Sequence, residues 1–184
     1  MAIASPHDLP ARCRAIELLV LDVDGVLTDG AIVIDDLGVE SKHFHVKDGG
    51  GIALWRKSGK KVAILSGRSA ACVDVRAKEL GITPVIQGST DKKASILSLI
   101  QELGLEPGQV CAMGDDLADL PMLGVSGLAA CPGDAVAEVI ESADIVSHFD
   151  GGKGAVREVI EILLKNQGTW DGLVAGYRVE GGSG

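Results

Sequence analysis

Short apolar segments alternate with helical segments along most of the chain, and this alternation constrains the fold more than any other feature. Strand-like apolar runs lie at residues 15–21, 60–65, 82–88, 109–113, 127–133 and 144–148. Helical segments follow several of them, at residues 69–81, 91–104, 134–143 and 153–165. Strands that are apolar throughout are typical of a parallel sheet that helices cover on both faces. The sequence therefore predicts a doubly wound α/β fold of the Rossmann type, in a single domain spanning residues 1–184.

Residues 31–46, "AIVIDDLGVESKHFHV", interrupt this alternation. They contain two short strand-like runs around a turn at "DDLG", which predicts a β-hairpin flap directly after the first strand and its loop. The chain has no insertion long enough for a large cap domain. Residues 171–184 are expected to form a flexible tail, because "AGYRVEGGSG" offers few apolar side chains for packing.

Chemically reactive residues follow the predicted strands at the point where each strand ends. In chain order they are Asp22 and Asp24, then Ser66, Gly67 and Arg68, then Lys92, and finally Asp115, Asp116 and Asp119. Right-handed crossovers bring the carboxyl ends of parallel strands to one edge of the sheet, so we expect these side chains to lie together. Several carboxylates beside one lysine and one hydroxyl favour a site for Mg²⁺ and a phosphoryl group, since Mg²⁺ prefers oxygen ligands.

The spacing within the two acidic groups supports this interpretation. Asp22 and Asp24 would point to the same face of an extended strand, and Gly25 permits a bend that separates their roles. Asp115 and Asp119 are four residues apart, so we expect them to share one face of a helix that begins there. A solvated strand end or a helix cap would explain either group alone. Similar groups at four strand ends indicate a functional site.

Charge and cysteine content narrow the possible function classes. The formal net charge of −9 argues against a nucleic-acid partner or an anionic membrane surface, although a bound divalent cation would still allow a phosphorylated substrate. The four cysteines form no CxxC pair, which favours reduced and buried thiols. The segment "MAIASPHDLPARCRA" lacks the apolar core of a signal peptide, and no run reaches the length of a membrane span. We therefore expect a cytoplasmic protein.

The same residues resemble the four sequence motifs of the haloacid dehalogenase superfamily of phosphotransferases. "DVDGV" resembles the first motif, "ILSG" the second, Lys92 the third and "GDDLAD" the fourth, within residues 16–165. Within that superfamily, "DVDGVLTDG", "KDGGGIALW", "GDDLADLPML" and "GGKGAVREV" resemble the small capless phosphatases of 3-deoxy-D-manno-octulosonate 8-phosphate (KDO 8-phosphate). The resemblance implies an Mg²⁺-dependent phosphatase that releases the free sugar acid and phosphate in lipopolysaccharide precursor synthesis.

The resemblance also implies a role for each residue of the site. Asp22 would attack phosphorus and form an aspartyl phosphate, while Asp24 would protonate the sugar oxygen and then activate water. Asp22, Asp115 and the backbone carbonyl of Asp24 would hold Mg²⁺. The other residues would bind the phosphate oxygens (Ser66, Gly67 and Lys92) or support the site (Asp116, and Asp119 by orienting Lys92 or a metal-bound water).

The sugar acid would be bound at less specific positions. By the same resemblance, its contacts are Asp24, the segment His45, Val46, Lys47, Asp48 and Gly49, and the two arginines Arg68 and Arg76. Lys47, Arg68 and Arg76 are suited to a carboxylate, but Arg76 would equally fit a solvated position on a helix. His43 and His45 have a spacing that can bind a metal from one face of a strand, although a polar hairpin face is the simpler explanation for His43.

The exposed hairpin and the open site raise the question of assembly. An apolar hairpin that is marginally stable alone favours self-association. The resemblance implies a homotetramer in which the hairpins pack together and a neighbouring chain helps to complete each site. The tail "GYRVEGGSG" would then fold over the pocket.

Three other functions stay open from the sequence: a 9-phosphate phosphatase for a nine-carbon sialic-type sugar acid, a phosphoryl-accepting signalling receiver, and a noncatalytic module that binds a sugar phosphate. The receiver is disfavoured because the strand at residues 60–65 ends in Ser66 and not in an aspartate. The noncatalytic module is disfavoured because both Asp22 and Asp24 are present. The first alternative would use the same chemistry as KDO 8-phosphate hydrolysis.

Overall fold

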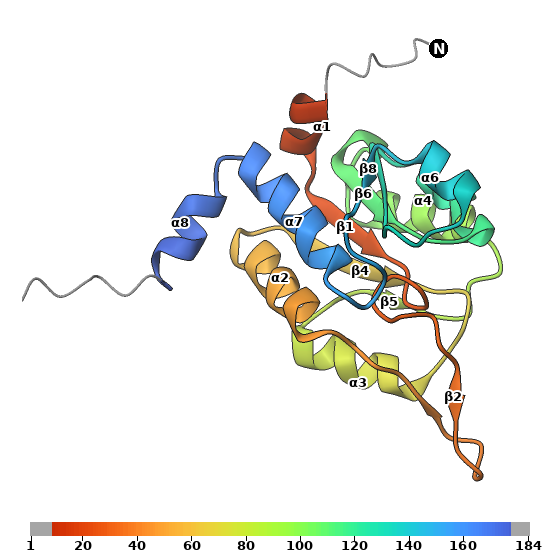
Figure 1. Cartoon of the computed structure of the whole chain (residues 1–184). Coiled ribbons are helices and arrows are strands. Elements are labelled where there is room, and N and C mark those ends of the chain that lie inside the picture. Colours follow the sequence, from red (N-terminus) through yellow and green to blue (C-terminus); the bar gives the residue numbers. More distant parts are fainter. Residues whose placement is uncertain (1–8, 178–184) are drawn as a thin grey trace, which may run out of the picture.

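A six-stranded parallel sheet forms the centre of the molecule (Figure 1). The computed structural model describes residues 9–177. The strand order is β5-β4-β1-β6-β7-β8, and neighbouring strands run parallel throughout this sheet. Its strands span Leu18–Leu21 (β1), Lys61–Leu65 (β4), Val85–Ile86 (β5), Val110–Met113 (β6), Leu128–Cys131 (β7) and Ile145–Val146 (β8). The predicted doubly wound α/β fold is confirmed.

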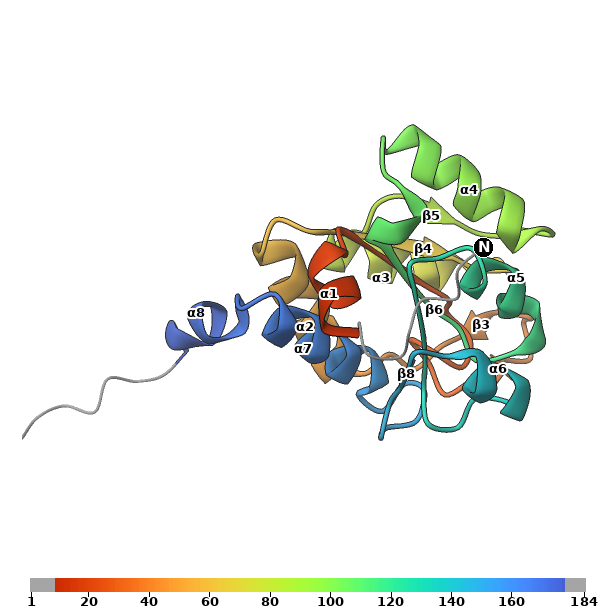
Figure 2. The ribbon, with the colours of Figure 1, turned by 90° about the horizontal axis from the view of Figure 1, so that it is seen from above.

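Helices cover the two faces of the sheet (Figure 2). They span Leu9–Ala15 (α1), Val46–Lys57 (α2), Ala71–Leu80 (α3), Lys92–Glu102 (α4), Leu120–Leu123 (α5), Ala137–Ser142 (α6), Ala155–Asn166 (α7) and Trp170–Ala175 (α8), with 3-10 turns at Pro107–Gln109 (η2) and Leu117–Asp119 (η3). Successive residues of a strand point to opposite faces. Leu19 and Leu21 of β1 therefore pack with α1, α2, α3 and α7, whereas Leu18 and Val20 pack with α4, α5 and α6.

Helix α2 is the long element that the sequence pattern did not indicate. It contains Gly49, Gly50 and Gly51, and glycine is a poor helix former. The close packing of α2 explains two of these glycines. A Cβ at Gly49 would lie 2.5 Å from Nη2 of Arg76 in α3, and one at Gly51 would lie 3.0 Å from Cδ of Arg157 in α7. The glycines thus let α2 approach both neighbouring helices.

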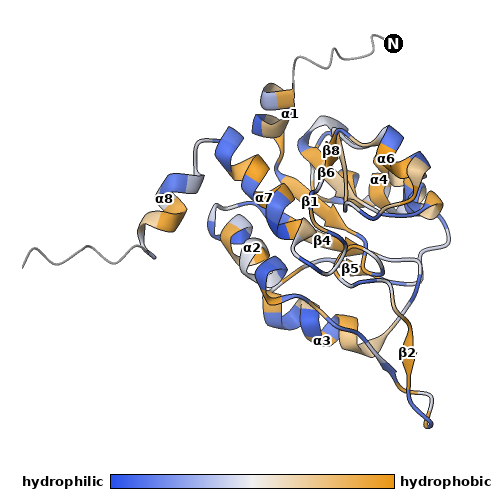
Figure 3. Ribbon diagram, in the orientation of Figure 1, coloured by the Kyte–Doolittle hydropathy of each residue, from blue (hydrophilic) through white to orange (hydrophobic). Residues whose placement is uncertain are grey.

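The segment at residues 31–46 contains the expected hairpin, which projects from the body of the molecule (Figure 1). Its strands are short: β2 (Val33–Ile34) pairs antiparallel with β3 (Glu40–Ser41). Asp35 organises the turn, because its carboxylate accepts hydrogen bonds from the N–H groups of Leu37 at 2.9 Å and Val39 at 2.8 Å. Figure 3 shows that β2 is apolar although it lies in this projecting hairpin.

The first part of segment 171–184, which was predicted as a flexible tail, forms helix α8. It follows α7 and lies at the opposite end of the molecule from the hairpin (Figure 1). Residues 178–184 lie outside the described residues, and so does most of the segment that was expected to cover the pocket. Among residues 9–177, no helix combines the length and the apolar character that a membrane crossing requires.

Candidate active site

The residues predicted to carry the chemistry line one hollow of about 340 Å³ at the carboxyl edge of the sheet. Its lining consists of Asp22, Asp24, Gly30, Ile32, Ser66, Gly67, Arg68, Lys92, Asp115, Asp116, Ala118 and Asp119. The strands account for this convergence, because β1, β4 and β6 are neighbours and end beside one another. The Asp22 N–H donates to the Met113 carbonyl at 3.0 Å, which holds the end of β1 against the end of β6.

Lys92 joins two of the carboxylates at the base of this hollow. It is the first residue of α4, whose start is fixed by Asp91, because the Asp91 carboxylate accepts the Ala94 N–H at 2.9 Å. The buried Lys92 ammonium donates to Oδ1 of Asp22 at 2.8 Å and to Oδ1 of Asp119 at 2.5 Å. Lys92, at the start of α4, thus fixes the position of Asp22, the predicted nucleophile.

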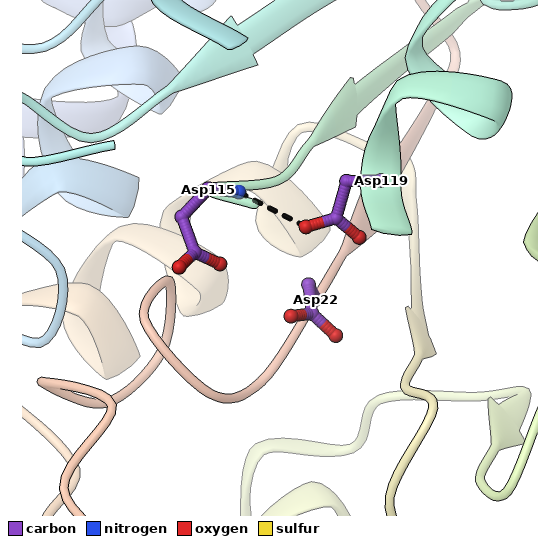
Figure 4. A group of neighbouring side chains, drawn as sticks. All are labelled: Asp22, Asp115 and Asp119. Atoms are coloured by element: carbon purple, nitrogen blue, oxygen red, sulfur yellow. Dashed lines mark hydrogen bonds between the residues drawn. The ribbon is translucent and has the colours of Figure 1, made fainter. Parts of the chain in front are cut away.

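Asp119 holds the loop that carries Asp115, and it does so without a shared helix. Its Oδ2 accepts the Asp115 N–H at 3.0 Å (Figure 4). The same oxygen accepts the Asp116 N–H at 3.3 Å. The prediction that Asp115 and Asp119 share a helical face is wrong, because the turn η3 begins only at Leu117 and Asp116 caps it. A backbone-to-carboxylate bond across the loop brings the two residues together instead.

Three carboxylates form a group suited to a divalent cation. Oxygens of Asp22, Asp115 and Asp119 lie within 4.8 Å of one another (Figure 4). Burial, and next the negative charge of Asp119, raise the pKa of Asp22 to about 6. Burial, and next the charge of Asp22, raise the pKa of Asp115 to about 7. The Lys92 ammonium lowers both pKa values, but not enough to cancel the effects of burial and of the neighbouring carboxylates. The three carboxylates therefore lack nearby positive charge.

The donor set fits Mg²⁺. Oδ1 of Asp115 is buried and has no hydrogen-bond partner, so a ligand oxygen is free at the required place. Three carboxylates and one ammonium leave two negative charges, which one Mg²⁺ would neutralise. Both Asp119 oxygens are already occupied by Lys92 and by backbone N–H groups. Asp22 and Asp115 are therefore the side chains that would hold the ion, with Asp119 supporting them.

Asp24 belongs to a separate ring of four charged side chains that includes the hairpin. Lys42 donates to Oδ1 of Asp24 and, at 2.7 Å, to Oε1 of Glu40. Arg68 closes the ring, because Nη2 donates to Oε2 of Glu40 at 3.0 Å and Nε lies 3.5 Å from Oδ2 of Asp24. The sequence interpretation missed Glu40 and Lys42. Glu40 and Lys42 are two residues apart on an expected strand, so their side chains should point to the same face. This spacing was the feature of the sequence that could have indicated their pairing.

Ser66 and Gly67 occupy the start of the loop after β4, as predicted for phosphate contacts. The buried Ser66 hydroxyl accepts the Arg68 N–H at 3.3 Å. The position of a Cβ on Gly67 would be 4.0 Å from Cε of Lys92, so these two residues border the same space. Arg68 is half exposed and faces the hollow from the same loop.

The other predicted sugar contacts do not line this hollow. A separate small cavity, which Phe44 also lines, is bordered by His45, Asp48, Gly49 and Arg76. Lys47 borders a different hollow beside α7. Val46 is exposed. The buried Asp48 carboxylate accepts the Arg157 N–H at 2.8 Å in the first turn of α7. Arg76 pairs with Glu79 at 2.8 Å.

Comparison with known proteins decides the family. A family model for haloacid dehalogenase-like hydrolases matches residues 81–160. The 3-deoxy-D-manno-octulosonate 8-phosphate phosphatase of Salmonella typhimurium is 43% identical over 167 residues, which cover 91% of this chain and 88% of that protein. The chain belongs to the KDO 8-phosphate phosphatase family. The resemblance predicted from the sequence motifs is thereby confirmed, and the chain is a phosphoric monoester hydrolase.

Solved structures of the KDO 8-phosphate phosphatase family agree with this assignment. The enzyme of Moraxella catarrhalis, in complex with magnesium ion, phosphate ion and KDO, superimposes with a TM-score of 0.91 at 38% identity, covering 94% of this chain and 99% of that one. The cobalt-bound enzyme of Haemophilus influenzae gives a TM-score of 0.83 at 36% identity, covering 85% and 92%. Metal-bound relatives with this fold support Mg²⁺ as the cofactor, as expected from the three carboxylates.

Proposed function

We propose that this protein hydrolyses KDO 8-phosphate to KDO and phosphate with Mg²⁺ as cofactor, a step in lipopolysaccharide precursor synthesis. The observation that carries the proposal is the hollow in which Asp22, held by Lys92, lies beside Asp115 and Asp24. A nucleophile, a metal site and an acid–base group meet there. Phosphate-monoester hydrolysis is very slow without a catalyst and needs all three.

The reaction has two steps on the chain's own residues. The Asp22 carboxylate attacks phosphorus, and the bond between phosphorus and the sugar oxygen breaks. Asp24 gives its proton to that departing oxygen, which leaves an aspartyl phosphate on Asp22. Asp24 then accepts a proton from water as the water attacks the aspartyl phosphate and releases inorganic phosphate. Both aspartates return to their starting states.

The other residues hold the phosphoryl group while charge moves across it. Asp22, Asp115 and the backbone carbonyl of Asp24 would hold Mg²⁺, which would supply positive charge to offset that of the phosphoryl oxygens and the Asp22 carboxylate. Ser66, the Gly67 N–H and Lys92 bind the remaining phosphoryl oxygens, because they border the hollow from two neighbouring elements.

The sugar acid contacts are part of the same proposal. In this proposal Arg68 binds the carboxylate of KDO, and its half-exposed side chain in the lining of the hollow supports this role. The contacts assigned to residues 45–49 and to Arg76 stay proposals that rest on the family resemblance. Alanine substitution at Lys47 and Arg76 tests them through KM for the sugar acid phosphate.

Assembly into a homotetramer also belongs to the proposal. The hairpin exposes Ile34 by 58% and Leu37 by 88%, and a hairpin this short gains stability by packing against copies of itself. Light scattering should give the mass of four chains, and Ile34→Lys should lower it. A monomer at micromolar concentration would contradict the assembly. A cytoplasmic location, expected for an enzyme of a biosynthetic sugar phosphate, is tested by cell fractionation.

The activity itself is tested by phosphate release from a panel of substrates. The panel contains KDO 8-phosphate, the 9-phosphate of a nine-carbon sugar acid, glucose 6-phosphate and p-nitrophenyl phosphate. We expect the highest kcat/KM for KDO 8-phosphate, loss of turnover with EDTA, and recovery with Mg²⁺. Asp22→Asn, which keeps the shape of the side chain, should abolish turnover. Full turnover in this variant, or a preference for glucose 6-phosphate, would refute the proposal.

A further inference from the structure

The ring that contains Asp24 ties the hairpin to the reaction centre. Its four members alternate in charge: Asp24, Lys42, Glu40 and Arg68. Each carboxylate uses both of its oxygens within the ring, one toward Lys42 and one toward Arg68. The ring is therefore closed in geometry, and it is balanced in charge when Asp24 is ionised, the state in which Asp24 accepts a proton from water in the proposed reaction.

We propose that Lys42 is a positioning residue, which orients the Asp24 carboxylate for proton transfer, and that Glu40 fixes Lys42. The inference rests on the proposed function, because it assumes that Asp24 is the acid–base group. It adds the hairpin as the element that sets the direction of the proton donor.

Asp24 needs such a partner because its own torsions do not fix the carboxylate. The terminal torsion of an aspartate is broad, so its two oxygens are oriented by what they contact. Lys42 contacts Oδ1, and Arg68 lies 3.5 Å from Oδ2, a distance too long for a good hydrogen bond. Lys42 therefore makes the shorter and more directive contact.

The burial of Lys42 separates its role from that of Arg68. The Lys42 side chain is only 1% exposed, and it does not line the hollow. Burying an ammonium is unfavourable unless it is paired, and both of its partners here are protein carboxylates. Arg68 is 50% exposed and lines the hollow. Arg68 is thus open to a substrate anion, whereas Lys42 is directed at Asp24.

The hairpin depends on the same contacts for its own position. The strands β2 and β3 have two residues each, too few to fix the hairpin against the body of the molecule. Lys42 follows β3 directly, and Glu40 lies within β3. The bonds from Lys42 to Asp24 and from Arg68 to Glu40 join the hairpin to the loops after β1 and β4. Asp24 and the hairpin consequently position each other.

The test uses the leaving group to isolate proton transfer. A sugar alkoxide leaves poorly without a proton, whereas p-nitrophenolate leaves well without one, so only the first substrate depends on a well-oriented Asp24. In Lys42→Met we expect kcat for KDO 8-phosphate to fall about 10²-fold, a loss that a displacement of about 1 Å can cause. We expect kcat for p-nitrophenyl phosphate to fall less than about fivefold. Lys42→Arg should keep a higher kcat for KDO 8-phosphate than Lys42→Met does. Glu40→Gln should lower the same kcat, but by less than Lys42→Met does.

Two controls keep the result specific. His43→Ala changes an exposed residue between Ser41 and Phe44 on the same segment and should leave both kcat values within twofold of wild type. In Asp24→Asn, the further change Lys42→Met should add almost nothing, because Lys42 acts through Asp24. Thermal unfolding of each variant establishes that it is folded.

The outcomes separate this inference from the proposed function. A wild-type protein that releases phosphate from neither substrate would refute the proposed function. An active wild type combined with an equal loss of both activities in Lys42→Met and Glu40→Gln, or with no loss, would refute the role of Lys42 alone. A higher KM for KDO 8-phosphate with unchanged kcat would also overturn it, because Lys42 would then bind substrate.

Discussion

Gly151 lies where the loop between β8 and α7 meets the loop after β1. Its replacement by alanine should lower kcat, because the added methyl group would push the loop after β1 out of position. A Cβ at Gly151 would overlap the Gly25 carbonyl oxygen and would lie 2.5 Å from the Gly25 carbonyl carbon. Gly25 is also close to the Asp115 carboxylate, because a Cβ on Gly25 would lie 2.8 Å from Oδ1 of Asp115. The backbone of Gly25 thus lies between the loop that carries Gly151 and the carboxylate of Asp115, the proposed metal ligand.

The size of the effect follows from these distances. Carbon atoms in contact are about 3.5 Å apart or more, so the two loops must separate by about 1 Å to admit the methyl group. Overpacking of this kind costs about 1–3 kcal/mol of unfolding free energy, which for a chain of this size lowers Tm by about 2–12 °C. A displacement of about 1 Å near the reacting groups lowers kcat about 10²-fold.

Steady-state kinetics with KDO 8-phosphate and thermal unfolding of Gly151→Ala measure both effects. The matched control is Gly108→Ala, because Gly108 is exposed and has no heavy atom within 4 Å of its Cβ position. Neither glycine has a positive φ, so backbone strain affects neither variant. Wild-type kcat in Gly151→Ala would refute the idea that this loop fixes the Asp24–Gly25 backbone.

Two further predictions concern the metal site. Because the pKa values of Asp22 and Asp115 are raised from 3.8 to about 6 and about 7, the folded metal-free protein retains protons that the unfolded chain has lost between about pH 4 and pH 7. Its stability should fall as pH rises through that window, and the gain in Tm on adding Mg²⁺ should be larger at pH 8 than at pH 5; a gain that shrinks with pH would contradict this. Asp115→Asn should remove most of the Mg²⁺-dependent gain in Tm, whereas Asp116→Asn, at an exposed position that caps η3, should keep it; equal losses would argue against Asp115 as the main ligand.

The order of strands and helices was predictable because each element carries its own signal. The apolar run of β1 and the periodicity of α4 are local patterns, and parallel topology then brings the ends of β1, β4 and β6 together. The meeting of Asp22, Ser66 and Asp115 in one hollow follows from that topology without any knowledge of side-chain contacts. This is why the residues that line the hollow could be grouped from the sequence, although the local geometry of Asp115 and Asp119 could not.

Features that depend on contacts between distant segments were not predictable in the same way. Helix α2 contains three glycines, and its packing against α3 and α7 explains two of them, Gly49 and Gly51. The contact of Lys42 with Asp24 depends on the position of the hairpin beside the loop after β1, which no local pattern indicates. The local geometry of Asp115 and Asp119 departed from helical spacing because a side chain bonds the backbone there.

The two glycine-rich segments singled out by their resemblance to the family, "KDGGG" and "GGKG", have a common physical explanation. The Asp48 carboxylate accepts the Arg157 N–H and so fixes the first turn of α7. The loop that leads into this turn contains Gly151 and Gly152, and the Gly152 N–H donates to the Val26 carbonyl at 3.0 Å. The start of α2 therefore fixes the start of α7, and the loop before α7 fixes the backbone that follows Asp24. Residues far from the hollow thus hold the backbone that follows Asp24, and the contact from Lys42 in the hairpin holds the Asp24 carboxylate.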